Sequence, residues 1–431
     1  MILPLKDCKI TSQYGIIRDD NKLHTGIDFI STSKDKNVKA IRSGIVRVTP
    51  YDEEGYGNYI SIQQEDGFRA LYCHLEKVLV KSGDIISEGQ VIGIEGDTGN
   101  STGIHLHLEL RKAPYNPADH INLAEYLGIK NEVGRVTYIQ NYELLEYLGI
   151  MDYWRQGYKG KGIVVASIEN TETLHGKKVA DILKQVLPEA TILTDIKYYK
   201  EIPEKLDGYT SSLDASFDDR ITRIEKAKEM YSKNVFMTCA VGNENTEDCS
   251  HLAKYDNWVS VGACTFNGGK PKKAVYSSVT EYIDVMSLTF WETKYGMFNG
   301  SSCSTPALQG MAQLAKQFFR DNIGKILDVQ KLFYFVKDNW IDLEEEGHDA
   351  KTGHGLFILP KPWTVNFEKY IEMEEEEMRY NKMEEIPEWG KETVDKLINL
   401  ELLKGDENGN LDLSHDMLRV FVINDRAGLY D

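Results

Sequence analysis

The stretch STGIHLHLEL, residues 101–110, places two histidines two positions apart in a segment that otherwise has the pattern of a buried strand. Side chains alternate between the two faces of a β-strand, so His105 and His107 point one way while Leu106 and Leu108 point the other way. Two imidazoles on one face of a strand can take part in the same chemical function. Their presence in a strand that is otherwise apolar therefore calls for a functional explanation.

Two upstream segments supply further polar side chains of the same kind. LHTGIDF (23–29) contains His24 and Asp28 on either side of a glycine. In LYCHL (71–75), His74 lies at the end of a predicted strand. A catalytic zinc site needs three protein ligands, an open position and an acid or base beside it. An isolated His-x-His pair is also compatible with two hydrogen-bonded structural histidines, but the three segments together favour a metal site.

The segments HTGID, YCHL and GDTGNSTGIHLHLEL resemble the lysostaphin-type (LytM-like) zinc endopeptidases, which cut peptidoglycan peptides. The glycine turns SGIV (43–46), YGN (56–58) and EGQVIG (88–93) extend the resemblance over nearly all of residues 10–118. The resemblance implies that Zn2+ is bound by His24, Asp28 and His107. It also implies that His74 and His105 stand beside the metal, where they act on the attacking water and stabilise the oxyanion.

The chain changes its pattern along its length, which predicts a multidomain protein. Residues 1–130 have short alternating strands between glycine-rich turns, typical of an all-β domain. From 138 to 360, strands alternate with helical stretches, which predicts an α/β domain with a parallel sheet. We expect an acidic helical linker over 361–386 and a small helical module over 387–431.

The C-terminal module faintly resembles S-layer-homology-type wall modules, through its GDENGNLDL turn and the LRVFVINDRAGL segment that follows. A helical packing or oligomerisation tail fits the same residues equally well. The turn does not have the ligand spacing of an EF-hand.

The central domain carries a second group of chemically active residues. YGMFNGSSCSTPALQG (295–310) places Ser302 in a glycine-flanked turn before a helix, where the helix dipole and amide donors favour a nucleophilic hydroxyl. This segment, together with AVGNEN (240–245) and QGYKGKGIVVASIE (156–169), resembles the subtilisin-like serine proteases over roughly 140–360.

The subtilisin-like resemblance implies that Ser302 is the nucleophile, Asn243 the oxyanion donor and His175 the general base. Glu169 takes the position where the family usually has aspartate. Only six positions separate Glu169 from His175, much closer than is usual in the family. A glutamate reaches one methylene further and can still hold an imidazole, but the short loop can misplace it. Two alternatives follow: an active protease, or a domain that has lost activity and serves as a scaffold.

Composition narrows the classes of function. The chain has 431 residues and a formal net charge of −18, which argues against a nucleic-acid binder. It has no apolar run long enough for a membrane span and no secretory signal pattern, so we expect synthesis in a cytoplasm. The six cysteines include no CxxC pair and are expected to be free thiols.

Together these features predict a phage or prophage-type cell-wall lysin, made without a signal peptide and acting at the wall after lysis or as part of a virion. Its substrate is peptidoglycan, and its protease domain is predicted to cut its own chain near 115–140 or 361–390. Virion tail proteins are possible partners. The alternative is a virion structural or wall-binding protein in which only the zinc domain is active. A secreted nutrient protease is disfavoured by the missing signal.

Overall fold

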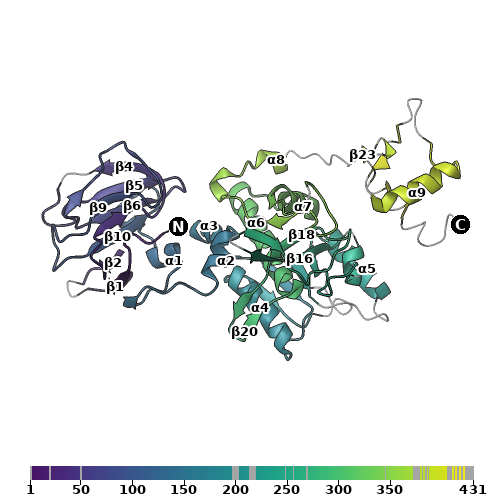
Figure 1. Cartoon of the computed structure of the whole chain (residues 1–431), viewed down its shortest axis with the longest axis horizontal. Helices are drawn as coiled ribbons and strands as arrows, with labels where there is room; N and C mark the ends of the chain where they lie inside the picture. The colour runs from purple at the N-terminus through teal and green to yellow at the C-terminus, as the bar shows by residue number, and fades with distance from the viewer. Residues whose placement is uncertain are drawn as a thin grey trace. The chain divides into compact units, whose positions relative to one another are not determined.

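The computed structural model describes residues 2–422 except 19–20, 49–50, 197–202, 213–219, 248, 256, 268–269, 345, 372–378, 381, 384–385, 387, 405–409, 412, 415–416 and 419–420. The chain divides into two compact units, Met1–Val365 and Asn366–Asp431. The first unit contains both predicted enzyme domains (Figure 1).

The N-terminal domain is built from β-strands with two short helical turns (Figure 1). Its elements are β1 (Cys8–Ser12), β2 (Gly26–Ser31), β3 (Asn37–Lys39), β4 (Gly44–Val48), β5 (Ile60–Gln64), β6 (Arg69–Cys73), β7 (Lys77–Val78), β8 (Ile85–Ile86), β9 (Val91–Ile94), β10 (Leu106–Arg111), η1 (Pro117–Asp119), α1 (Leu123–Leu127) and β11 (Gly134–Arg135). The predicted all-β class is confirmed.

An antiparallel sheet in the order β11-β1-β2-β10-β6-β5-β4-β8 forms the body of this domain, and β3, β9 and β7 form a second sheet. The central strand β10 pairs with β2 on one side and β6 on the other. In this register His107 lies opposite Asp28 on β2 and opposite Cys73 on β6, the residue before His74. Sheet pairing therefore brings three segments that are distant in sequence to one place.

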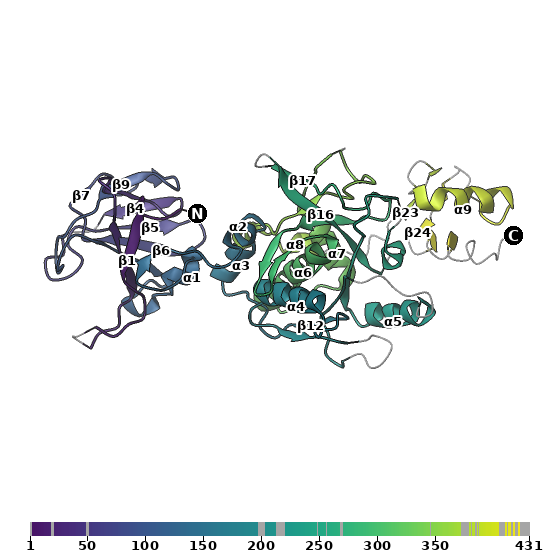
Figure 2. The same cartoon turned by 60° about the horizontal axis from the view of Figure 1, so that its bottom comes forward.

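The central domain contains a mostly parallel sheet covered by helices (Figure 2). Its elements are α2 (Tyr142–Tyr147), α3 (Ile150–Arg155), β12 (Val164–Ser167), α4 (Leu174–Val186), β13 (Thr191–Leu193), β14 (Gly208–Ser211), α5 (Arg220–Ser232), β15 (Phe236–Ala240), η3 (His251–Lys254), β16 (Val259–Asn267), β17 (Lys270–Lys273), β18 (Val285–Leu288), β19 (Trp291–Thr293), β20 (Gly296–Phe298), α6 (Ser301–Ile323), α7 (Val329–Asp338), β21 (Trp340–Ile341), β22 (Leu356–Phe357) and η4 (Pro362–Thr364).

The sheet runs β13-β12-β14-β15-β16-β18-β22-β21, with β17 paired to β16. The neighbours from β13 to β22 are parallel, whereas β17 and β21 are antiparallel additions. Helix α6 packs on β14, β15, β16 and β18 and also contacts α4. Because its side chains from Cys303 to Phe319 are buried, α6 is the central helix of the domain, and its N-terminus is held firmly in place.

A buried ion cluster joins the N-terminal β-domain to helix α3. The Arg42 guanidinium donates to Asp152 Oδ1 at 2.9 Å and lies 3.4 Å from Asp66. Arg155 donates to the same Asp152 oxygen at 2.9 Å and to the Tyr126 carbonyl at 2.8 Å. One carboxylate thus serves two guanidiniums whose side chains are only 6% and 1% exposed.

We expect Asp152→Ala to lower the free energy of unfolding of the first unit by about 1–3 kcal/mol, because it removes a shared hydrogen-bond acceptor from two buried cations, of which Arg42 keeps Asp66 and Arg155 keeps Glu146. Chemical denaturation followed by tryptophan fluorescence measures this. Asp321→Ala is the control, since the Asp321 pair with Arg320 is 38% and 29% exposed and should contribute at most about 1 kcal/mol. Equal effects of the two variants would contradict a structural role for the cluster.

The second unit contains α8 (Glu368–Ile371), β23 (Arg379–Tyr380), α9 (Glu388–Asn399) and β24 (Leu413–Ser414). Its small core is formed by Ile386, Val394, Leu413 and Leu418. A two-stranded antiparallel sheet pairs β23, within the predicted linker, with β24, within the predicted helical module. The acidic residues 372–378 of the predicted helical linker lie outside the described residues.

The six cysteines are free thiols, as predicted. Among the described residues, no helix has the length and apolar character needed to cross a membrane.

Candidate functional site

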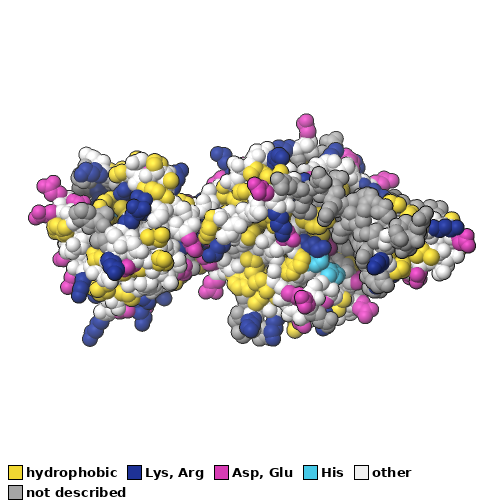
Figure 3. Space-filling view, turned by 90° about the horizontal axis from the view of Figure 1, so that it is seen from above, with side chains coloured by type: hydrophobic (Ala, Val, Ile, Leu, Met, Phe, Trp, Pro, Cys, Tyr) yellow, Lys and Arg dark blue, Asp and Glu magenta, His cyan; other side chains and the backbone are white. Residues whose placement is uncertain are grey.

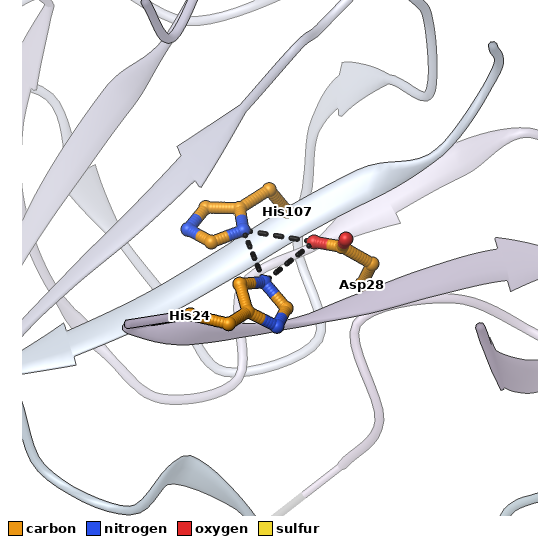
Figure 4. Close-up of side chains that lie close together, drawn as sticks. All are labelled: His24, Asp28 and His107. Atoms are coloured by element: carbon orange, nitrogen blue, oxygen red, sulfur yellow. Dashed lines mark hydrogen bonds and ion pairs between the residues drawn. The ribbon is translucent and has the colours of Figure 1, made fainter. Parts of the chain in front are cut away.

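Three predicted metal ligands meet inside the N-terminal domain (Figure 4). Asp28 Oδ1 lies 2.8 Å from His107 Nδ1 and 3.1 Å from His24 Nε2, and the two imidazole nitrogens are 3.1 Å apart. All three side chains are buried. They come from β2, from β10 and from the loop before β2, so the sheet register positions two of the three.

The donor set of this cluster fits zinc. His24 Nδ1 lies 2.7 Å from the Gln13 carbonyl oxygen, which can only accept, so the ring proton sits on Nδ1 and the lone pair of a neutral ring is on Nε2. That lone pair faces the carboxylate oxygen of Asp28. Acceptor atoms converge at one buried point, and a cation between them relieves their repulsion. Catalytic zinc sites have three protein ligands, and two imidazole nitrogens with one carboxylate oxygen are a suitable set.

Asp28 is held as an anion. Burial alone would raise the pKa of its carboxyl group, but the two imidazoles beside it, those of His107 and His24, outweigh burial and keep this pKa well below its usual range. Arg18 holds the other carboxylate oxygen, because its guanidinium donates to Asp28 Oδ2 at 2.7 Å. The second carboxylate oxygen is thereby occupied, and Oδ1 is the one turned toward the histidines.

The other two predicted histidines stand next to the cluster. The His74 and His105 rings are 4.7 Å apart between centroids, and His105 Nε2 is 3.9 Å from Asp28 Oδ1. Each ring has Nδ1 against a backbone carbonyl, Thr98 at 2.9 Å for His74 and Gly103 at 2.7 Å for His105. Both therefore donate from Nδ1 and leave Nε2 available. Burial lowers the pKa of His74 to about 4, so this ring is neutral at pH 7.

The sequence analysis missed a group of polar residues behind His107. Glu109 is fully buried and is contacted by Thr25, Tyr56 and Arg111. A signal for Glu109 was present, because the strand alternation that places His105 and His107 on one face places residue 109 there too. Thr25 and Tyr56 gave no such signal, since they lie in turns whose positions depend on the tertiary fold.

In the central domain, the turn before α6 brings Asn243 to Ser301, the residue before the predicted nucleophile Ser302. Asn243 Oδ1 accepts from Ser301 N at 2.8 Å, and this contact leaves the Nδ2 amide protons available to other acceptors. Gly300 adopts φ 101°, a left-handed conformation that side-chain-bearing residues avoid. An added Cβ there would lie 3.2 Å from Asn243 Oδ1. The turn therefore depends on glycine for both its backbone shape and its contact with Asn243.

Ser212, which follows β14, connects Glu169 to Ser302. Its backbone N–H donates to the Glu169 carboxylate, and its carbonyl accepts from Ser302 Oγ at 3.3 Å. Ser212 Oγ in turn donates to the Ser302 carbonyl at 2.9 Å. That carbonyl needs a donor because Pro306, four residues on, has no N–H to give it. The sequence analysis did not identify Ser212.

The predicted triad is only partly assembled. Glu169 is 1% exposed and accepts from Ser167 Oγ and Ser212 N. Burial raises the pKa of Glu169, although these hydrogen bonds oppose the shift. His175 lies in the first turn of α4 with its ring edge-on to Phe298, 5.4 Å between centroids. Among the described residues, no hydrogen bond or ion pair joins His175 to Glu169 or Ser302. Its triad role therefore stays a prediction.

The surface of the molecule carries both signs of charge. On the face drawn in Figure 3, described lysine and arginine side chains lie among aspartates and glutamates and make no continuous basic field.

Comparison with known proteins finds a family match in each of the two domains. The model of peptidase family M23 matches residues 22–120, and the model of the subtilase family matches residues 162–355. The chain is 43% identical over 101 residues to the peptidoglycan DD-endopeptidase ShyA of Vibrio cholerae, a match that covers 22% of this chain and 22% of that protein. It is 42% identical over 88 residues to lysostaphin of Staphylococcus simulans, covering 20% of this chain and 18% of that protein.

Among solved structures, the catalytic domain of lysostaphin from Staphylococcus simulans is 33% identical, with 28% of this chain and 91% of that chain covered and a TM-score of 0.26. The matched segments span about a fifth of the length of the two curated relatives. Both family matches lie inside the domains predicted from the sequence.

Proposed function

We propose that this chain, which joins an M23 zinc metallopeptidase domain to a subtilase domain, cuts peptide bonds of peptidoglycan with the first domain. The observation that carries the proposal is that His24, Asp28 and His107 form a buried cluster, with His74 and His105 beside it. The peptidoglycan endopeptidases among its relatives support the same substrate class.

His24 Nε2, Asp28 Oδ1 and His107 Nδ1 would hold the zinc ion. Bound there, zinc polarises the scissile carbonyl and makes water a stronger nucleophile at neutral pH. His74, neutral because its pKa is lowered, is suited to take a proton at Nε2. His105, anchored through Nδ1, would stabilise the oxygen that becomes negative by donating from Nε2, which requires a proton on both ring nitrogens. Arg18 keeps Asp28 from rotating away.

The test is digestion of purified Gram-positive cell walls by the purified chain. We expect new free amino groups to appear in wall peptides, identified by mass spectrometry, to disappear with a zinc chelator and to return on adding Zn2+. Wall clearing without new amino groups would contradict peptide-bond cleavage.

For the central domain we propose serine peptidase chemistry with Ser302 as nucleophile, His175 as base, Glu169 as the acid and Asn243 as oxyanion donor. Asn243 is suited to this role because Ser301 engages its Oδ1 and leaves Nδ2 to donate. His175 enters its role as a neutral ring, since burial and Lys178 lower its pKa.

We expect Asn243→Ala to lower kcat of the serine peptidase about 10²- to 10³-fold with little change in KM, the usual cost of removing one oxyanion donor. Steady-state kinetics on an unstructured protein substrate such as casein measures it. The matched control is Asn245→Ala, two residues away and exposed. Similar losses in both variants would indicate a folding defect rather than loss of an oxyanion contact.

We also propose that the protease cuts its own chain, near 361–390 rather than near 115–140. The boundary between the two compact units falls at Val365 and Asn366. In contrast, residues 115–140 include α1, whose leucines are buried in the N-terminal core, and β11, which pairs with β1. We further propose that this chain is a phage or prophage lysin. Detection of the chain in purified virions tests this origin.

A second candidate function is favoured by one observation. Since no described hydrogen bond joins His175 to Glu169 or Ser302, the subtilase domain fits a scaffold or wall-binding role in a virion protein whose zinc domain alone is active. A fluorophosphonate probe separates the two functions, because it labels an activated serine and leaves a scaffold unlabelled.

A further inference from the structure

The histidines around the metal cluster are anchored in two different ways. In His24, His74 and His105, the Nδ1 proton goes to a backbone carbonyl, so the tautomer is fixed by the main chain. His107 is the reverse case, because its Nδ1 faces Asp28 and His24. Its proton must therefore be on Nε2 if Nδ1 is to bind a cation. His107 thus needs a different acceptor behind it.

Glu109 occupies the position behind His107. Its Oε2 lies 3.6 Å from His107 Nε2, about 0.4 Å beyond the usual upper limit of about 3.2 Å for a hydrogen bond. Nε2 is enclosed and has no hydrogen-bond partner within bonding distance. Buried polar groups are almost always paired, and an unpaired N–H is costly. A small closing movement of Glu109 and His107 satisfies it.

The Glu109 carboxylate is itself fixed by donors alone. Thr25 Oγ1 and the Tyr56 hydroxyl each donate to Oε2 at 2.9 Å. Arg111 Nε donates to Oε1, and its Nη2 donates to the Tyr56 hydroxyl at 3.0 Å. With His107 Nε2–H, every neighbour of the carboxylate that is in reach offers a proton. The pocket is therefore built for an acceptor-only group, which is an ionised carboxylate.

The plane of the His107 ring is also restricted. Tyr56 stacks on it at 5.9 Å between ring centroids, with 22° between the planes. A Cβ added to Gly26 would also come within 2.8 Å of His107 Cε1. The Tyr56 ring and the Gly26 backbone therefore both restrict the His107 ring.

We propose that Glu109 is the positioning residue that holds His107 in its Nε2–H tautomer and so turns the Nδ1 lone pair toward Asp28 and His24. This inference rests on the proposed zinc site and adds a residue that neither the predicted ligand set nor the family match names. A carboxylate behind a metal-binding histidine orients the ring and raises the basicity of its ligating nitrogen, and its loss typically costs about 10- to 100-fold in metal affinity.

The test is Zn2+ affinity of the full chain, measured by competition with a chromogenic chelator and without any wall substrate. We expect Glu109→Gln to bind Zn2+ about 10- to 100-fold more weakly. Glutamine has nearly the same shape, but its NH2 group must face either Arg111 or the side of Thr25, Tyr56 and His107, where only donors lie. Glu109→Asp keeps the charge and withdraws it from His107, and should also weaken binding.

The matched control is Asp66→Asn, which alters another buried carboxylate paired with an arginine and a tyrosine, Arg42 and Tyr126. Asp66 lies at the opposite end of β6 from His74, so Zn2+ affinity should not change. A tautomer readout separates orientation from general damage. NMR of the metal-free chain labelled with 15N-histidine should show protonated Nε2 of His107 in the parent and a mixture in Glu109→Asp.

The outcomes are distinct. If the parent binds Zn2+ and both Glu109 variants bind it equally tightly, or if the His107 tautomer is unchanged in them, the inference is wrong while the zinc site stands. If the parent itself binds no Zn2+, the proposed metal site fails and the inference falls with it. Weakened binding with a changed tautomer, and a normal Asp66→Asn control, supports both.

Discussion

Replacing His107 with alanine should abolish wall hydrolysis and lower Zn2+ affinity by more than about 100-fold, because losing a ligand must cost more than the roughly 10- to 100-fold that losing its supporting residue costs. His107 supplies Nδ1, which lies within 3.1 Å of both other ligand atoms. Two remaining ligands are fewer than the three that catalytic zinc sites use. Chelator competition and release of amino groups from purified walls measure the two effects.

The matched control is His120→Ala. His120 belongs to the same domain but bonds to the Tyr14 hydroxyl at 2.9 Å and is not one of the three clustered residues. This variant should clear walls at the parental rate. A His107→Ala chain that keeps folded-state circular dichroism and still releases amino groups would contradict the assignment of the metallopeptidase site. Serine peptidase activity should be unchanged in both variants, since the residues proposed for it lie in the other domain.

The clustering of histidine and aspartate side chains in the N-terminal domain could be predicted because part of its information is local and periodic. The two-residue alternation in HLH gave the shared face of His105 and His107, and the structure adds Glu109, which obeys the same alternation. The resemblance to lysostaphin-type enzymes named His24, Asp28 and His74. What no local pattern contained was the β2–β10–β6 register, which decides that these residues meet.

The central domain was less predictable for a physical reason. The fold follows from the alternation of strands and helices, and the turn at Gly300 follows from its glycine. The direction of a buried glutamate does not follow from sequence, because it depends on which donors the folded chain offers. Here the donors to Glu169 are Ser167 and the backbone of Ser212, from another strand end. The short spacing between Glu169 and His175 indicated that the triad acid could be misplaced. The contacts with Ser167 and Ser212 show where the Glu169 carboxylate is held.

Replacing Ser302 with alanine should lower kcat/KM of the serine peptidase by at least about 10⁴-fold, because the nucleophile has no substitute and only oxyanion and binding contacts remain. Ser302 lies in the first turn of α6, beside the Asn243 contact to Ser301. Casein hydrolysis and fluorophosphonate labelling measure the loss. Ser304→Ala is the matched control, since Ser304 lies on the same helix and its hydroxyl donates to the Gly300 carbonyl at 3.4 Å.

The same Ser302→Ala chain decides between the functions proposed for the subtilase domain. If the parent is clipped between 361 and 390 while Ser302→Ala keeps its intact mass, the domain is a peptidase that acts on its own chain. If the parent stays whole yet binds the probe at Ser302, its substrate is another protein. If neither chain is clipped nor labelled and walls are still cleared in a His107-dependent way, the domain is a scaffold. That third result would follow if His175 stays unpaired from Ser302, since an unassisted hydroxyl is a weak nucleophile.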